Sequence, residues 1–237
     1  MKTKYVAMLF ATILTALPFA ACNKDNNNNE PDTENTLTFT VGDASFTMVK
    51  VEPGTFMMGA LEGDTNALED EEKPVHQVTL TNTYYIGQTE VTQELYTAVM
   101  GSNPSNFTNG SNLPVEKVSY NDAITFCQQL SSLTGKHFTL PTEAQWEYAA
   151  RGGHKTPATP TLFAGSDDIE AVGWHKGNSD STTHAVAQKA PNTLGLYDMT
   201  GNVFEWCLDW YGPYSANAAS DPQGPTTGSE RVSRGGS

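Results

Sequence analysis

The stretch that most constrains the fold is residues 192–210, which read NTLGLYDMTGNVFEWCLDW. Its first half contains glycine and asparagine, which favour tight turns and positive φ angles. Its second half is aromatic and strand-like, with Phe204, Trp206 and Trp210 as its large rings. Turn glycines beside carboxylates in an apolar stretch are typical of a site for a hard cation such as calcium, which binds carboxylates and backbone carbonyls. The polar side chains inside this stretch are Asp198, Asn202, Glu205 and Asp209.

Residues 1–21 have the pattern of an N-terminal signal peptide. Lys2 and Lys4 form a basic start, and residues 5–17 form an uncharged, mainly apolar run that is too short to span a bilayer. Phe-Ala-Ala directly before Cys22 resembles the cleavage box of bacterial lipoproteins. We therefore expect a lipidated Cys22 that anchors the protein in the cell envelope, at the outer membrane, on its periplasmic or surface face. The alternative is plain secretion, with Cys22 an ordinary thiol.

The chain after the cleavage box divides into a tether and one domain. Residues 22–36 include four consecutive asparagines and almost no apolar side chains, so we expect a disordered polar tether. Residues 37–237 are long enough for one domain with a substantial core.

The charge of the chain is strongly acidic. The sequence has 13 basic and 27 acidic residues, a net charge of −14, and the loss of Lys2 and Lys4 with the signal peptide makes it −16. Such a balance argues against a nucleic-acid partner, because phosphates would be repelled.

Residue patterning predicts an α+β domain with little regular structure. Alternating apolar residues predict short strands, and Thr92, Ser119 and the Thr142–Gln145 capping box mark the starts of three helices. Residues 158–189 are rich in glycine, serine and threonine and are expected to be mostly loop. The expected strands cover 37–41, 45–52, 55–58, 75–80 and 84–87, and the expected helices follow the three caps as far as Met100, Gly135 and Gly152.

Three blocks of the sequence resemble the formylglycine-generating enzymes, also called sulfatase-modifying factors. They are LGLYDM followed by GNVFEW at 194–206, LPTEAQWEYAARGG at 140–153, and RVSRGGS at 231–237. The resemblance runs from about Phe46 to the end of the chain. It implies the fold of that family, a loop-rich α+β arrangement related to C-type lectin-like domains.

The resemblance also implies a calcium site in the 192–210 stretch. The ligands would be the side chains of Asp198 and Glu205 and the backbone carbonyls of Gly201 and Val203. The alternative is that the two carboxylates merely hydrogen-bond the turn. A second calcium site of the family does not carry over, because its asparagine ligand is expected where this chain has residues 172–174, Val-Gly-Trp.

In the family, a pair of cysteines binds copper(I) and oxidises a cysteine of an unfolded sulfatase to formylglycine. The family's active-site serine matches Ser237, and Phe204 stands where the family has a tryptophan, so the indole N–H donor is lost. The copper-binding cysteines would lie beyond Ser237, as would the closing strands. Copper is therefore expected only if residues beyond this chain supply those cysteines, and we expect no oxidase activity from residues 1–237.

The other candidate ligands carry weaker signals. Cys127 and Cys207 either pair with each other or stay reduced and buried, and the resemblance implies a structural role for Cys127 with a partner near the C-terminus. The five histidines show no metal-ligand spacing. The acidic run 69–72 is interpreted as a solvated loop rather than a metal site.

These observations support two readings of function. The first is an exported lipoprotein of the sulfatase-modifying factor family, whose parent protein acts on a sulfatase polypeptide. The second is a non-catalytic lipoprotein that uses the same fold to bind a surface ligand or to build an envelope assembly.

Overall fold

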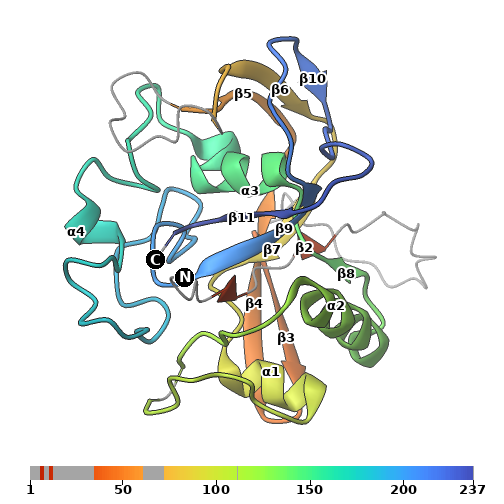
Figure 1. Cartoon of the computed structure of the whole chain (residues 1–237), viewed down its shortest axis with the longest axis vertical. Helices are drawn as coiled ribbons and strands as arrows, with labels where there is room; N and C mark the ends of the chain where they lie inside the picture. The colour runs from red at the N-terminus through yellow and green to blue at the C-terminus, as the bar shows by residue number, and fades with distance from the viewer. Residues whose placement is uncertain (1–5, 8–10, 13–34, 61–71, 111, 237) are drawn as a thin grey trace, which may run out of the picture.

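The computed structural model describes residues 6–7, 11–12, 35–60, 72–110 and 112–236. The described elements form three small sheets and a few short helices joined by long loops, an α+β arrangement (Figure 1). The strands are β1 (Val6–Ala7), β2 (Ala11–Thr12), β3 (Thr36–Val41), β4 (Ala44–Val51), β5 (Gly54–Met58), β6 (His76–Leu80), β7 (Tyr84–Gly87), β8 (Phe138–Thr139), β9 (Phe204–Trp210), β10 (Ala219–Ser220) and β11 (Arg231–Arg234). The helices are α1 (Gln93–Met100), α2 (Tyr120–Thr134), α3 (Glu143–Ala150) and α4 (Ile169–Val172), with a 3-10 turn at Gly153–Lys155.

The predicted starts and ends of the helices are confirmed. The hydroxyl of Thr92 accepts a bond from Leu95 N at 3.2 Å and so caps α1. Thr142 and Gln145 form the expected capping box at the start of α3, with bonds of 2.9 and 3.2 Å. Gly135 ends α2 with a φ of 68°, a conformation that glycine adopts without strain. Local residue chemistry therefore determines these helix boundaries.

The sheets are arranged so that β4 and β9 lie between two hydrophobic clusters. Successive side chains of a strand point to opposite faces, and Met48 of β4 packs with α1 and α2 whereas Val49 packs with α3. In β9, Cys207 lies on the α3 side and Trp206 on the opposite side. Figure 1 shows β9 and β11 crossing the middle of the molecule, with α3 on one side and α1 and α2 on the other.

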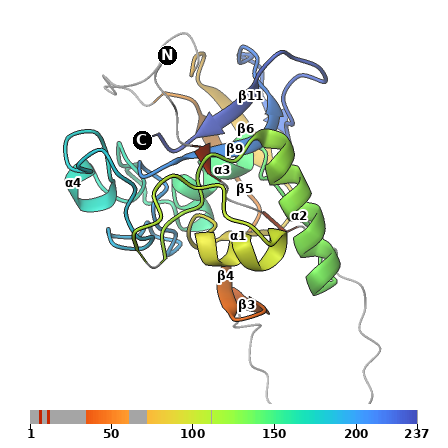
Figure 2. The ribbon, with the colours of Figure 1, turned by 60° about the horizontal axis from the view of Figure 1, so that its bottom comes forward.

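The cluster around α1 and α2 holds the predicted core residues of those helices. Tyr96 and Phe126 stack at 5.5 Å between ring centroids, and the β3–β4 hairpin packs beside α1 (Figure 2). Leu95, Val99, Ala123, Phe126, Cys127 and Leu130 recur at helical spacing in the sequence, and all six are buried.

The N-terminal segment pairs with the domain at two places. Backbone of β1 runs parallel to β9, and β2 lies between β7 and β8 as the strand that joins β8 to its sheet. Removal of residues 1–21 as a signal peptide would therefore leave β7, β8 and β9 each without one neighbour. In the part of the chain that the structure describes, no helix has the length and apolar character to cross a membrane.

Several predictions fall outside the described residues and are not tested by the structure. They are the lipidation of Cys22, the tether except for its last two residues, the acidic run except for Glu72, and the role of Ser237.

Candidate functional site

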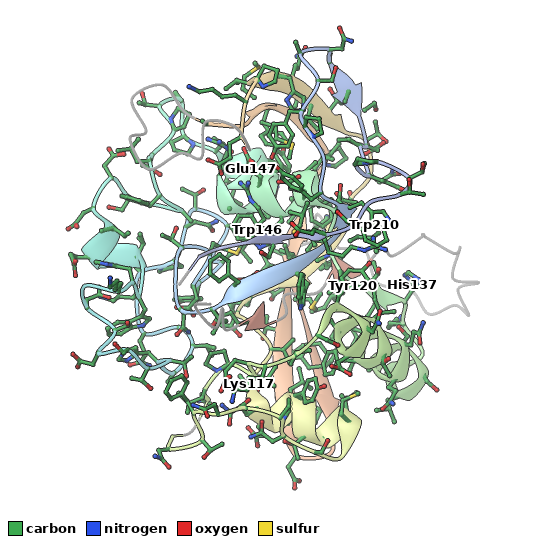
Figure 3. All side chains as sticks on the ribbon, viewed as in Figure 1. Lys117, Tyr120, His137, Trp146, Glu147 and Trp210 are labelled. Carbon is green, nitrogen blue, oxygen red and sulfur yellow. The ribbon has the colours of Figure 1, made fainter. Side chains whose placement is uncertain are left out.

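A groove of about 780 Å³ opens between α3 and β11. Residues 160–164 and 199–201 complete its walls, and all four residues of β11 line it. Figure 3 labels Trp146 and Glu147 on α3, at one side of this groove. Its aromatic lining consists of Trp146, Phe163, Phe204 and Tyr211. The groove thus combines aromatic rings with a strand that ends its sheet among the described residues.

A network of buried charges forms one wall of the groove. Arg234 Nη2 donates to Glu147 Oε2 at 2.8 Å, and Arg234 Nη1 lies 3.2 Å from Glu72 and 3.3 Å from Glu143. Arg151 donates to the other oxygen of Glu147 at 2.7 and 2.9 Å. Burial alone would lower the pKa of Arg234, but Glu147 and Glu143 raise it above its usual value. Each carboxylate of this wall therefore has a guanidinium partner.

The structure brings Phe204 to the groove together with the C-terminal glycines. Phe204 begins β9 and is half-buried, and it lines the groove with Gly235 and Gly236. Sequence analysis placed Phe204 at an active-site position, and its ring faces the same space as the end of the described chain.

A second polar site lies under the groove, in the turn that precedes β9. Asp198 is 2% exposed and Glu205 is fully buried, and each uses only one oxygen in a hydrogen bond. Asp198 Oδ2 accepts from Ala187 N at 2.7 Å, and Glu205 Oε2 accepts from Trp146 Nε1 at 2.7 Å. The other two oxygens, Asp198 Oδ1 and Glu205 Oε1, are buried without a partner. Hydrogen bonds from Ala187 and Trp146, which lie outside the turn, thus account for half of the carboxylate oxygens.

The backbone of this turn takes a shape that depends on its glycine and asparagine. Gly201 and Asn202 have φ angles of 90° and 61°. Gly201 N donates to Gly235 O, and a side-chain carbon added to Gly235 would lie 3.2 Å from Val203 O and 3.9 Å from Glu205 Oε1. A carbonyl and an unpartnered carboxylate oxygen therefore lie beside the same point.

Sequence reasoning missed a third carboxylate at this turn. Glu90, between β7 and α1, is 1% exposed and accepts bonds from Asn202 Nδ2 at 2.8 Å and from Val203 N at 3.2 Å. It lies more than a hundred residues away in sequence, so no local pattern connects it to the turn. Only the packing of β7 against the β9 turn brings these groups together.

The three carboxylates share a low-dielectric environment without a basic partner. Burial raises the pKa of Asp198 to about 6 and that of Glu205 to about 8, and it raises the pKa of Glu90 well above its usual value. Asp198 and Glu205 raise the pKa of Glu90 further, and no lysine or arginine of the described residues is a cause that lowers the pKa of any of the three. This turn differs from the charged wall of the groove, where arginines compensate the glutamates.

The donor set fits a calcium ion better than a transition metal. Within the described residues, no three His, Cys, Asp or Glu side chains gather closely enough to hold a metal ion by themselves. A cation at the turn would need backbone carbonyls beside the two carboxylates, and hard cations such as calcium accept such a mixture. The unpartnered oxygens of Asp198 and Glu205 are the ones available to it.

The stretch at 172–174 packs against the same turn. Trp174 O accepts from Asn202 N at 2.8 Å, and the Trp174 ring stacks on His184 at 3.7 Å between centroids. Gly201 must be a glycine because an added side-chain carbon would lie 2.0 Å from Trp174 O. This segment therefore supports the turn from outside.

Neither described cysteine reaches the groove. Cys127 and Cys207 are both free and buried, so the predicted alternative of a bond between them is wrong. They lie in different hydrophobic clusters, Cys127 on α2 and Cys207 on the α3 side of β9. Burial raises the pKa of Cys127 to about 12 and raises that of Cys207 well above its usual value. Such thiols are poor nucleophiles and poor metal ligands.

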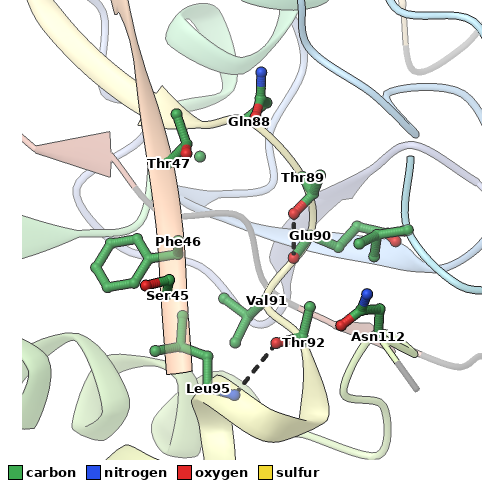
Figure 4. Close-up of a pocket in the computed structure, with 12 residues that line it drawn as sticks. Ser45, Phe46, Thr47, Gln88, Thr89, Glu90, Val91, Thr92, Leu95 and Asn112 are labelled. Atoms are coloured by element: carbon green, nitrogen blue, oxygen red, sulfur yellow. Dashed lines mark hydrogen bonds between the residues drawn. The ribbon is translucent and has the colours of Figure 1, made fainter. Parts of the chain in front are cut away.

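A smaller cavity of about 200 Å³ lies beside β4 and the start of α1 (Figure 4). Thr89 Oγ1 donates to Glu90 O at 3.0 Å, and Thr92 Oγ1 accepts from Leu95 N at 3.2 Å. Both hydroxyls form hydrogen bonds with nearby backbone groups. The larger groove is therefore the stronger candidate for binding a ligand.

The fold and these sites agree with one protein family. The profile of the sulfatase-modifying factor enzyme 1-like domain matches residues 38–237. The chain therefore belongs to the sulfatase-modifying factor family, as the three sequence blocks predicted.

Individual relatives span different functions. A protein named chaperone protein LppX, from Paenibacillus barcinonensis, is 29% identical over 97% of this chain and 86% of its own length. The formylglycine-generating enzyme of Streptomyces coelicolor is 39% identical over 56% of this chain, and the match covers 44% of that enzyme. The solved structure of Treponema denticola variable protein 1 has a TM-score of 0.73 and 34% identity, with 86% of this chain and 88% of that chain covered. These similarities confirm the predicted α+β fold.

Proposed function

We propose that this chain is a calcium-stabilised binding domain of an envelope lipoprotein, and that its groove holds an extended segment of another polypeptide. The observation that carries the proposal is the groove itself, in which the edge strand β11 lies beside four aromatic rings.

The position of β11 favours an extended ligand. Its sheet has the order β1-β9-β11, so β11 pairs with β9 on one side and ends the sheet on the other among the described residues. An unpaired strand edge accepts an added strand through main-chain hydrogen bonds, and nearby side-chain pockets select residues of that strand.

Two relatives favour a polypeptide ligand over a small molecule. One carries the name of a chaperone protein and the other that of a formylglycine-generating enzyme, and the family resemblance implies action on an unfolded sulfatase chain. A groove of about 780 Å³ with aromatic walls suits several residues of an extended chain.

Replacement of Tyr211 by alanine is expected to weaken binding of an unfolded polypeptide about tenfold, because exposed aromatic residues at the edge of a binding groove often contribute 1–2 kcal/mol. Tyr211 lines the groove and is 43% exposed. Fluorescence anisotropy with labelled, reduced and carboxymethylated α-lactalbumin would measure the dissociation constant. Leu133→Ala is the matched control, because Leu133 is 59% exposed on α2 and does not line the groove. Equal affinities for both variants and the original chain would contradict the proposal.

The calcium ion has a structural role in this proposal. The Asp198 and Glu205 carboxylates and the Gly201 and Val203 carbonyls would hold it, and it would supply positive charge to a turn that lacks a basic side chain. The ion would thereby order the start of β9, from which Phe204 enters the groove.

Formylglycine generation is the second candidate function, and the similarity to the Streptomyces enzyme favours it. That chemistry needs two thiolates for copper(I), and Cys127 and Cys207 are buried away from the groove. We expect residues 1–237 with copper(I) and oxygen to leave a cysteine-containing sulfatase peptide unchanged. Mass spectrometry of the peptide detects the conversion of cysteine to formylglycine, with an active formylglycine-generating enzyme as the positive control. Conversion of the peptide by this chain would make formylglycine generation the favoured function.

The anchoring part of the proposal depends on Cys22. Replacement of Cys22 by serine is expected to abolish incorporation of radiolabelled palmitate and to release the protein from the membrane fraction, because the lipid chain supplies the anchoring energy. Cys127→Ser is the control and should keep both label and fractionation, since Cys127 is buried in the domain. An unlabelled original chain would instead support plain secretion.

A further inference from the structure

Glu90 is buried and does not line the groove, and both hydrogen bonds of its carboxylate lead to the turn that precedes β9. Its Oε2 accepts from Asn202 Nδ2 at 2.8 Å and its Oε1 accepts from Val203 N at 3.2 Å. Glu90 lies between β7 and the cap of α1 (Figure 4), so these bonds tie the turn to a different part of the fold.

We propose that Glu90 is a positioning residue of the calcium site and holds the Gly201–Val203 turn in the shape that directs its carbonyls toward the ion. This inference rests on the proposed calcium site.

The geometry of the turn shows why it needs such a residue. In a trans peptide the N–H and C=O groups point in opposite directions. The bond from Asn202 N to Trp174 O therefore directs the Gly201 carbonyl away from Trp174, and the bond from Val203 N to Glu90 orients the next peptide group. Trp174 thus orients the peptide group that carries the Gly201 carbonyl, and Glu90 orients the 202–203 peptide group, which links it to Val203, the second proposed carbonyl ligand.

The side chain of Asn202 reinforces this arrangement. Asn202 has a φ of 61°, and its amide donates to Glu90 and to His184 O while its carbonyl accepts from His184 N. Without Glu90, the amide would lose its shortest bond and Val203 N would be buried without a partner. We therefore expect the turn to relax and the ion to bind less tightly.

Glu90→Gln tests this role with almost no change in shape. Glutamine keeps one acceptor oxygen but replaces the other with a donor, so one of the two bonds to the turn is lost. We expect the calcium dissociation constant to rise about 10–100-fold, as is typical when a group that orients metal ligands is removed. Isothermal titration of the EGTA-treated chain with calcium chloride measures it.

Glu116→Gln is the matched control. Glu116 is also fully buried and also accepts bonds from two backbone N–H groups, those of Asn106 and Phe107, but it lies in a loop apart from the turn. We expect the calcium-free form of this variant to be less stable than that of the original chain. Its calcium dissociation constant should stay within about threefold, because distant sites behave independently.

Asn202→Gly provides a second test if Glu90→Gln fails to fold. Glycine accepts the positive φ, so only the side-chain bonds are lost, and a rise of about tenfold in the dissociation constant is expected. Unchanged affinity in both turn variants, or an equal loss in Glu116→Gln, would overturn the role of Glu90 while leaving the calcium site in place. Absence of calcium binding by the original chain would overturn the site and this role together.

Discussion

Replacing Arg234 by alanine is expected to lower the free energy of unfolding by about 3–5 kcal/mol, because Glu143 loses its guanidinium partner and the buried Glu147 keeps only Arg151. Glu147 is 3% exposed, so water cannot take the place of the arginine. For a domain of this size the loss corresponds to a fall of about 6–20 °C in melting temperature. Thermal unfolding followed by circular dichroism measures it.

Lys50→Ala is the control for a lost ion pair. Lys50 lies 3.5 Å from Glu52, whose side chain is 48% exposed, and surface pairs of this kind contribute less than about 1 kcal/mol. A melting temperature for Arg234→Ala as high as that of Lys50→Ala would contradict the prediction that this charge network stabilises the fold.

Removal of calcium is expected to lower the melting temperature by about 5–10 °C. Asp198 and Glu205 each bury an unpartnered oxygen, and no arginine or lysine in the described part of the chain compensates them. A ligand at one hundred times its dissociation constant stabilises the native state by about 2.7 kcal/mol, and 1 kcal/mol corresponds to about 2–4 °C in a domain of this size. With a dissociation constant of roughly 10 μM, 1 mM calcium provides this hundredfold excess. Scanning calorimetry in 1 mM calcium and in excess EGTA would measure the difference in melting temperature.

Two variants show whether the effect comes from the proposed site. Glu205→Gln should abolish the difference between calcium and EGTA, because it removes the closing carboxylate. Asp209→Asn should keep the difference, because Asp209 is a buried carboxylate of the same strand that caps α3 through Glu143 N at 2.8 Å. Terbium emission excited through tryptophan gives a second readout, since Trp146 Nε1 donates to Glu205. Identical melting in calcium and EGTA would refute the site.

The proposed calcium site and the groove are physically connected through Trp146. Its indole N–H donates to Glu205, and the guanidinium of Arg234 lies over its ring at 5.4 Å from the centroid. Gly235 adds a second connection, because its carbonyl accepts from Gly201 N and it lines the groove. An ion bound below would therefore stabilise the wall to which the proposed ligand binds.

Cation–π contacts hold the N-terminal end of β11, at Arg231. The Arg231 guanidinium lies between Tyr120 and Trp210, at 4.3 and 3.5 Å from the ring centroids, and its Nη1 donates to Leu208 O. Figure 3 labels Tyr120 and Trp210. Stacking of this kind stabilises partly desolvated arginines. Both arginines of β11 are thus held by contacts with neighbouring side chains, and both line the groove.

Local sequence determined much of this protein. The caps Thr92 and Thr142 and the stop Gly135 predicted helix ends to within a residue, because these boundaries depend on hydrogen bonds within three or four positions. The turn that precedes β9 was predicted for the same reason, with Asp198 and Glu205 as its carboxylates. The three sequence blocks predicted the family, and the match of the family profile to residues 38–237 confirms it.

Tertiary structure alone decided which side chains meet across the fold. Glu90 reaches Asn202, and Arg234 reaches Glu147, over separations of 112 and 87 residues. No periodicity or capping pattern encodes such pairs, because they depend on how the strands stack and which face each residue presents. The same packing placed Cys127 and Cys207 in separate clusters. Local sequence thus specified the turns and the helix ends. Only tertiary packing determined which groups pair with the buried charges, because it brings distant residues into one low-dielectric core.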